Sequence, residues 1–305
     1  MSFDPALDKA PELLARAARG AGCRPDYTQG GGGNVSVKLG SERMLIKASG
    51  CRLKDVSAGR GYVLVNYGNI RRKIAAGPGE EADFYDYLCS QALPVKDQKA
   101  AKPSIEAGFH ALLNTVVIHT HSVYANILNM SEEGHALGRE LFPGAEFIPY
   151  KSPGPQLCSA INDRARASGP QIFFLANHGL AVAHAGVEGA LELNEKVNET
   201  IRRGLSLPPY PEVPVSGVLT AHNSERLAAY GRDFMLKNVL SPDQALYCGP
   251  DGLEGRSEPE AVNEVLTALF YIMDCMKALK LTPRFLSKED VAYFDSMKSG
   301  RYSRK

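Results

Sequence analysis

The chain has 305 residues, of which 44% are hydrophobic and 23% charged, a composition that allows a sizeable buried core. Its 35 basic and 34 acidic residues give a net charge of +1 without a long block of one sign, which argues against nucleic acid or a membrane as the main partner. The six cysteines are scattered without a C-x-x-C pair, and the first residues show no basic region followed by an apolar run. We therefore expect a cytoplasmic protein without a signal peptide.

The first two thirds of the chain alternate between strand and helix patterns. Residues 5–19 have the apolar spacing of a helix, and residues 35–39 and 44–47 resemble two strands of a hairpin around Gly40-Ser41. Further strands are expected over residues 61–66, 115–121, 147–150, 171–176 and 180–183. Further helices are expected over residues 104–113, 122–129, 156–167 and 187–203. The pattern predicts an α/β or α+β fold with a mainly antiparallel sheet.

The last third of the chain has a different character. Four prolines fall between residues 207 and 214, a composition typical of a linker. Beyond them, helices are expected over residues 224–237, 258–280 and 287–297. We therefore expect an α/β domain over residues 1–205 and a mostly helical C-terminal extension over residues 206–305 that packs on it.

Three histidines have the spacing of a metal site. Side chains two residues apart in a strand point to the same face, so His119 and His121 would lie side by side. His178 follows another predicted strand, and Gly179 removes side-chain bulk next to it. A catalytic zinc commonly takes three protein ligands and leaves one position open. The pattern indicates a site for zinc or another first-row metal, but a short H-x-H sequence also fits histidines that are simply hydrogen-bonded in a core.

A carboxylate and three candidate anion-binding segments accompany the histidines. Ser104 stands at the predicted start of a helix, where it would cap the helix or bind an anion, and Glu106 would be a general base or a favourable first-turn charge. The four glycines at residues 30–33 form an anion-binding loop or a flexible turn, since neither a Walker nor a Rossmann pattern follows. Lys47, Ser49 and Gly50 add a lysine, a hydroxyl and a glycine at a strand end.

In chain order, five short motifs together resemble the class II aldolase/adducin family. They are Gly33-Asn34-Val35-Ser36, Ile46-Lys47-Ala48-Ser49-Gly50, Pro103-Ser104-Ile105-Glu106, His119-Thr120-His121 and Asn177-His178-Gly179. The resemblance covers about residues 8–205 and implies a three-layer α/β/α fold around a mainly antiparallel sheet. The C-terminal part, with Pro242-Asp243 and Gly249-Pro250, resembles the aldolase module of bifunctional rhamnulose-phosphate aldolase/alcohol dehydrogenases, although no dehydrogenase fingerprint is present.

The resemblance assigns roles to these residues. It implies a zinc ion held by His119, His121 and His178, with Glu106 as the catalytic acid and base. It also implies substrate-phosphate contacts from Gly33, Asn34, Ser49, Gly50 and Ser104. Fuculose-phosphate aldolase has two adjacent serines before the glutamate, whereas this chain has Ile105 after Ser104, so one phosphate contact is either lost or replaced by Lys47 or Lys102. His110, four residues after Glu106, would either support the site or pack in the core.

The implied function is that of a lyase in carbohydrate metabolism. A zinc-dependent aldolase would cleave a phosphorylated ketose or sugar derivative through an enediolate, in a homotetramer. An epimerase, decarboxylase or dehydratase of a sugar phosphate would use the same scaffold, and product analysis separates them. A non-catalytic interaction module of the adducin kind is the alternative from another class, but adducins lack the metal ligands that this chain retains.

Overall fold

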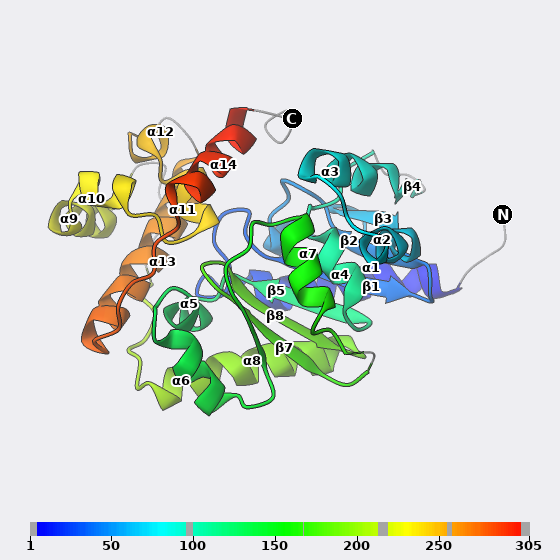
Figure 1. The fold of residues 1–305 in the computed structure, drawn as a ribbon, viewed down its shortest axis with the longest axis horizontal. Coiled ribbons are helices and arrows are strands. Elements are labelled where there is room, and N and C mark those ends of the chain that lie inside the picture. The colour runs from blue at the N-terminus through cyan, green and yellow to red at the C-terminus, as the bar shows by residue number, and fades with distance from the viewer. Residues whose placement is uncertain (1–4, 96–99, 167, 213–218, 255–257, 300–305) are drawn as a thin grey trace.

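The computed structural model describes residues 5–95, 100–166, 168–212, 219–254 and 258–299. Its centre is an eight-stranded sheet in the order β4-β3-β2-β1-β5-β8-β7-β6 (Figure 1). The strands are β1 (Asn34–Leu39), β2 (Arg43–Lys47), β3 (Tyr62–Asn66), β4 (Ala92–Leu93), β5 (Val116–Thr120), β6 (Glu146–Ile148), β7 (Gln171–Leu175) and β8 (Gly179–His184). Among these strands β6 and β7 pair in parallel and all other neighbours are antiparallel. The prediction of a mainly antiparallel sheet is confirmed.

Helices cover both faces of the sheet, because successive strand residues point to opposite sides. On β5, for example, Ile118 packs with one face's helices and Val117 with the other's. The first face carries α1 (Pro5–Gly22), α5 (Val123–Asn129) and α8 (Val187–Gly204), with α6 (Gly134–Leu141) at its margin. The second face carries α2 (Tyr67–Ala75), α3 (Glu81–Ser90), α4 (Ala107–Leu112) and α7 (Pro155–Asn162). This is the three-layer α/β/α arrangement that the resemblance implies.

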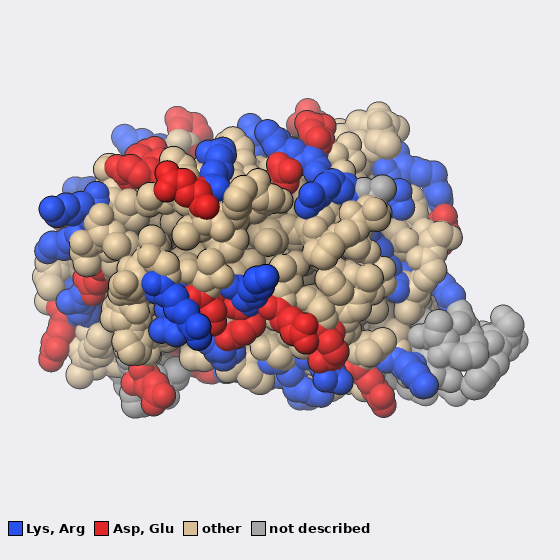
Figure 2. Space-filling model, turned by 90° about the horizontal axis from the view of Figure 1, so that it is seen from below, with Lys and Arg blue, Asp and Glu red and all other residues tan. Residues whose placement is uncertain are grey.

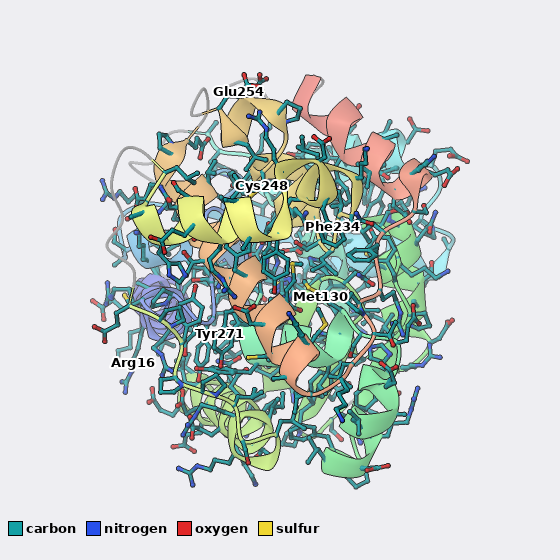
Figure 3. The ribbon with its side chains drawn as sticks, turned by 90° about the vertical axis from the view of Figure 1, so that its left-hand side faces the viewer. Arg16, Met130, Phe234, Cys248, Glu254 and Tyr271 are labelled. Atoms are coloured by element: carbon teal, nitrogen blue, oxygen red, sulfur yellow. The ribbon has the colours of Figure 1, made fainter. Side chains whose placement is uncertain are left out.

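The C-terminal extension is helical, as expected. Its elements are α9 (Ala221–Tyr230), α10 (Arg232–Lys237), α11 (Pro242–Tyr247), α12 (Pro250–Leu253), α13 (Pro259–Ala278) and α14 (Lys288–Ser299). Helix α13 packs against α5, and its apolar side chains join the same core cluster as β5 and α1. Figure 3 looks onto the extension, where α13 carries Tyr271 and lies beside Met130. The Tyr271 hydroxyl donates to the Pro208 carbonyl at 2.7 Å, so the start of the proline-rich segment is packed down. The last two residues of the proline-rich segment, 213 and 214, lie outside the described residues.

Three predicted helices have different limits in the structure. The helix expected from Ser104 begins at Ala107, because Pro103 forms a β-bridge with Ala48 that keeps the preceding backbone extended. The helix expected over residues 224–237 is two helices, separated at Gly231, whose φ of 90° no helix allows. The helix expected over residues 156–167 ends at Asn162, while residue 167 lies outside the described residues.

The surface mixes charges of both signs. On the face shown in Figure 2, acidic and basic side chains lie close together rather than in large separate patches. Ion pairs of this kind join α1 to α8, for example Arg16 to Glu188 at 2.7 Å. Among the described residues, the longest apolar helix still falls short of what a membrane crossing requires.

Candidate metal and active site

Neighbouring strands bring the three histidines together. His119 lies in β5 and His121 directly follows it, while His178 lies in the turn between β7 and β8. Because β5 and β8 are antiparallel neighbours, with Thr120 opposite Leu180, this turn meets the end of β5. The Nε2 atoms of His119 and His121 are 3.2 Å apart. The two-residue spacing therefore places both rings on one side, as predicted.

Glu106 closes the cluster. Its Oε1 atom lies 3.2 Å from the Nε2 atom of His119 and 3.2 Å from that of His178. One ligand atom from each of these four residues lies within 4.8 Å of all the others. The resemblance implies three histidine ligands, with Glu106 as the catalytic acid and base. In the structure the Glu106 carboxylate is also a potential fourth ligand.

The hydrogen bonds behind the rings determine which nitrogen atoms carry protons. The carbonyl of Leu180 can only accept, so Nδ1 of His119 donates to it at 2.9 Å. On His121, Nδ1 is bonded to the Asp243 carboxylate. When these rings are neutral, their two Nε2 atoms point lone pairs at each other, and Nε2 of His119 also faces the Glu106 carboxylate. Such a set of acceptors without a donor repels itself and is stabilised by a cation.

The distances within the cluster fit a tetrahedral ion. Metal–nitrogen distances of about 2.0–2.1 Å around a tetrahedral centre separate the ligand atoms by about 3.3–3.4 Å. The His119–His121, His119–Glu106 and His178–Glu106 separations are each 3.2 Å. Three of the six separations thus match a tetrahedral ion, and because all six lie within 4.8 Å, the four side chains could hold a divalent metal ion once the more distant ligand atoms move closer.

Glu106 is held on its other side by Asn34. The Nδ2 amide of Asn34 donates to Oε2 of Glu106 at 3.3 Å, and Oδ1 of Asn34 accepts from the Val35 amide at 3.0 Å. Burial alone would raise the pKa of the Glu106 carboxyl, but when the rings of His119 and His178 carry a second proton, their charge and hydrogen bonds outweigh burial and hold this pKa well below its usual value. The carboxylate is therefore charged and fixed in orientation.

The turn that carries His178 depends on its two neighbours. A Cβ atom on Gly179 would lie 2.3 Å from the Thr120 carbonyl oxygen and 2.9 Å from the His119 ring, so no larger residue fits. Asn177 has a left-handed backbone with φ 54°, which asparagine tolerates better than most residues. Its amide donates to the carbonyls of Leu240 and Arg284 in the C-terminal extension. The predicted function of Gly179 thus has a steric basis.

The residues predicted to bind phosphate fall into two groups. Asn34 and Lys47 are buried, and Nζ of Lys47 donates to the carbonyls of Gly31 at 3.2 Å and Cys51 at 2.7 Å. Burial lowers the pKa of the Lys47 ammonium, while the nearby Glu106, Cys51 and Asp243 groups oppose this shift. Lys47 therefore ties together the loops that flank the cluster.

The second group lies at the surface. Ser49 and Gly50 are exposed, and Ser104 is partly exposed. The Ser49 amide donates to the Lys102 carbonyl at 2.9 Å, next to the Ala48–Pro103 bridge, so the two predicted phosphate segments run side by side. Oγ of Ser104 accepts from the Glu106 amide at 3.3 Å. The exposed polar rim formed by Ser49, Gly50 and Ser104 therefore lies next to Glu106.

The glycine run is not an open anion loop over its first three residues. The amide of Gly30 donates to Oε2 of Glu264 at 2.6 Å, and that of Gly31 donates to the Tyr247 hydroxyl at 3.0 Å. The Gly32 amide donates to the Gln29 carbonyl at 2.9 Å. Gly33 has φ 78° and packs against the His119 carbonyl. The glycines allow close packing, and two of their amides are bound by the C-terminal extension.

Sequence reasoning missed Asp243 as part of the site, since its partner His121 is 122 residues away. The pair Pro242-Asp243 appears in the family resemblance, but nothing in it indicated a partner. For His110 the structure shows a core position: its Nδ1 lies 2.8 Å from Oγ of Ser36, and burial lowers its pKa to about 3. It lies outside the cluster of four potential ligands.

The fold and this site agree with the comparison with known families. Residues 12–204 match the Class II Aldolase and Adducin N-terminal domain, and the chain belongs to this family. The match ends before the C-terminal extension begins.

Individual proteins and solved structures are similar to this chain. Over 192 residues the chain is 28% identical to a 3-oxo-tetronate 4-phosphate decarboxylase of Haemophilus influenzae, which covers 58% of this chain and 78% of that protein. The fold of this chain is similar to that of the N-terminal class II aldolase domain of a conserved protein from Thermoplasma acidophilum. The TM-score is 0.57 and the identity 20%, over 67% of this chain and 96% of that one. A more distant likeness, with a TM-score of 0.45 and 11% identity, is to an L-fuculose 1-phosphate aldolase from Glaciozyma antarctica, over 92% of this chain and 94% of that one.

Proposed function

We propose that the protein is a zinc-dependent lyase that breaks a carbon–carbon bond near the carbonyl group of a phosphorylated sugar derivative. The observation that carries this proposal is the cluster of three imidazole Nε2 atoms and one carboxylate oxygen within 4.8 Å of one another. Imidazole and carboxylate ligands in a compact tetrahedral set suit zinc. When bound there, a divalent ion supplies Lewis-acid stabilisation for negative charge that develops on substrate oxygens.

Glu106 is the proposed acid and base, a role that requires its carboxylate to leave the fourth metal position when substrate oxygens bind there. Its carboxylate faces the metal ligands through Oε1 and is oriented by Asn34 through Oε2, so it can carry a proton to or from a carbon atom placed next to the ligand set. Ser49, Gly50 and Ser104 are the proposed phosphate contacts, because they form the exposed polar rim beside Glu106. Binding energy from a remote phosphate can then be used at the reacting carbon.

Two reactions fit this arrangement. In retro-aldol cleavage of a ketose 1-phosphate, the bond breaks with its electron pair left on the carbon next to the carbonyl, and an aldehyde departs as the hydroxyl loses its proton. In decarboxylation of a 3-oxo-tetronate 4-phosphate, the electron pair is left on the equivalent carbon and carbon dioxide departs. Glu106, after it takes a proton from the hydroxyl of the departing fragment in the aldol case or from water in the decarboxylation, protonates that carbon and yields dihydroxyacetone phosphate in both cases. The two reactions therefore share an enediolate and differ in the fragment that leaves.

Aldol cleavage is our first candidate, and the decarboxylase relative makes decarboxylation the second. The first experiment tests their shared step. Zinc-loaded protein in heavy water should exchange one hydroxymethyl hydrogen of dihydroxyacetone phosphate, as followed by NMR. We expect Glu106→Gln to slow this exchange by about 100-fold or more, since proton transfer by a placed side chain contributes about 10²–10⁴-fold. Glu188→Gln, at an exposed ion pair on α8, is the matched control and should exchange normally.

Exchange that continues at the wild-type rate in Glu106→Gln would refute the assigned role. A second experiment identifies the leaving fragment. Release of carbon dioxide from a 3-oxo acid phosphate defines a decarboxylase, and release of an aldehyde from a ketose 1-phosphate defines an aldolase. Conversion without loss of carbon would instead support an epimerase or dehydratase. We also propose residues 1–205 as the catalytic domain and a homotetramer as the working form, which light scattering of the purified protein would test.

A further inference from the structure

The C-terminal extension reaches the rear of the histidine cluster. Asp243 lies in the first turn of α11, is 8% exposed, and contacts Nδ1 of His121 through Oδ2. A small pocket is lined by His121 and His178 together with Ser241, Pro242 and Leu269 of the same extension. The extension therefore forms one wall of the site, although it lies outside the residues that match the family.

Asp243 is held firmly in this position. Ser241 caps α11 by accepting from the Gln244 amide at 3.2 Å. The Gln244 side chain accepts from the Leu240 amide at 2.8 Å and donates to the carbonyls of Met235 and Asn238. These bonds fix the backbone on both sides of Asp243, so its carboxylate has little freedom to leave His121.

Space for the contact is provided by Gly32. A Cβ atom at this position would lie 2.5 Å from Nδ1 of His121 and 3.0 Å from Oδ2 of Asp243. The adjacent glycines are held by the same extension, through Glu264 at Gly30 and Tyr247 at Gly31. The glycine run and the extension thus enclose the His121–Asp243 pair from two sides.

The three histidines differ in what orients them. His119 is oriented by a neutral backbone carbonyl, and Nδ1 of His178 has no hydrogen-bond partner among the described residues. His121 is the member of the set whose Nδ1 atom is bonded to a carboxylate. A carboxylate on Nδ1 keeps the proton there, leaves Nε2 free to bind a metal, and makes that nitrogen a stronger donor. Loss of such a partner typically weakens metal affinity about 10–100-fold.

We propose that Asp243 is a positioning residue for His121, and that the C-terminal extension is thereby a structural part of the metal site. This inference rests on the proposed metal-dependent function. It assigns the extension a role in metal affinity that is separate from the proton transfer assigned to Glu106.

The test measures zinc affinity of the full-length protein by competition with a chromophoric chelator at pH 7.5. Asp243→Asn keeps the side-chain shape and removes the charge, while Asp243→Ala removes the contact. We expect dissociation constants about 10-fold and up to about 100-fold higher, respectively. Asp233→Asn is the matched control, since Asp233 is an exposed residue of α10 in the same extension and should leave affinity unchanged. Melting temperatures of the metal-free proteins show whether each variant is folded.

A wild-type affinity in folded Asp243→Asn and Asp243→Ala would overturn the positioning role while leaving the proposed function intact. Absence of zinc binding by the wild-type protein would overturn both. If the Asp243 variants do not fold, nitrogen-15 NMR of the metal-free wild-type protein at pH 8 gives the answer directly. We expect His121 to carry its proton on Nδ1, whereas a proton on Nε2 would overturn the inference.

Discussion

Gly32→Ala is the substitution that tests the architecture of the site most directly. The added methyl group would meet Nδ1 of His121 at 2.5 Å, Oδ2 of Asp243 at 3.0 Å and the Gln29 carbonyl at 3.0 Å. Ordinary carbon contacts lie at about 3.5–4.0 Å, so His121 would have to move by roughly 1 Å. The backbone of Gly32 is not in the left-handed region, and the effect is therefore steric rather than conformational.

The expected loss of zinc affinity is large because a metal site tolerates only small changes in ligand distance. Ligand distances must agree to about 0.2 Å, so a displacement of roughly 1 Å removes His121 as an effective ligand. We expect the zinc dissociation constant to rise by about 100-fold or more, and overpacking to lower the free energy of unfolding by about 1–3 kcal/mol. Zinc competition titrations and urea unfolding of the metal-free protein measure the two quantities.

Gly144→Ala is the control for this experiment. Its Cβ atom would have no neighbour within 4 Å, and its φ is also outside the left-handed region, so affinity and stability should stay close to those of the wild type. If Gly32→Ala binds zinc as tightly as Gly144→Ala does, then His121 is not confined as the structure shows and the reasoning is refuted.

Two further predictions concern a ligand and a buried charge. His119→Ala should lose stoichiometric zinc, measured by elemental analysis after desalting, because it removes the Nε2 atom that lies 3.2 Å from both His121 and Glu106; retention of one zinc per chain would contradict its role. Burial, reinforced by Arg71, lowers the pKa of Lys38 to about 7, so between pH 7 and its ordinary value of 10.5 the unfolded chain binds the proton more tightly and stability should rise with pH. Burial of the charged lysine therefore destabilises the fold at low pH by about 1–3 kcal/mol, an amount that is discounted because the side chain is partly exposed, and Lys38→Met should remove this penalty. In urea unfolding the variant should therefore compare more favourably with the wild type at pH 6 than at pH 9.5, and an equal difference at both pH values would contradict the assignment.

The parts of the site that follow a local repeat could be predicted from the sequence. His119 and His121 share a face because the strand repeats every two residues, and Gly179 is needed because the chain turns against Thr120. Helix α2, which we did not predict, also follows a local repeat, since Tyr67, Ile70 and Ile74 are buried at helical spacing while Arg71 and Arg72 are exposed.

What could not be predicted depends on contacts between distant segments. Ser104 has the chemistry of a helix cap, but the bridge between Pro103 and Ala48 keeps its backbone out of the helix. The family resemblance assigns Asn34 to phosphate, and no local pattern indicates that its amide donates to Glu106. Pairing across the sheet determines both outcomes, and no local pattern encodes it.

The two carboxylates of the site act on opposite edges of the imidazole rings, and this separates their effects. Glu106 faces the Nε2 atoms, where a metal and the reacting carbon would lie, so its removal should affect proton transfer most strongly. Asp243 faces Nδ1 of His121, away from that position, so its removal should affect metal affinity. If metal affinity limits activity, excess zinc should restore turnover in Asp243→Asn but not in Glu106→Gln. The first carboxylate comes from the family domain and the second from the extension, so the site is complete only when both parts are folded together.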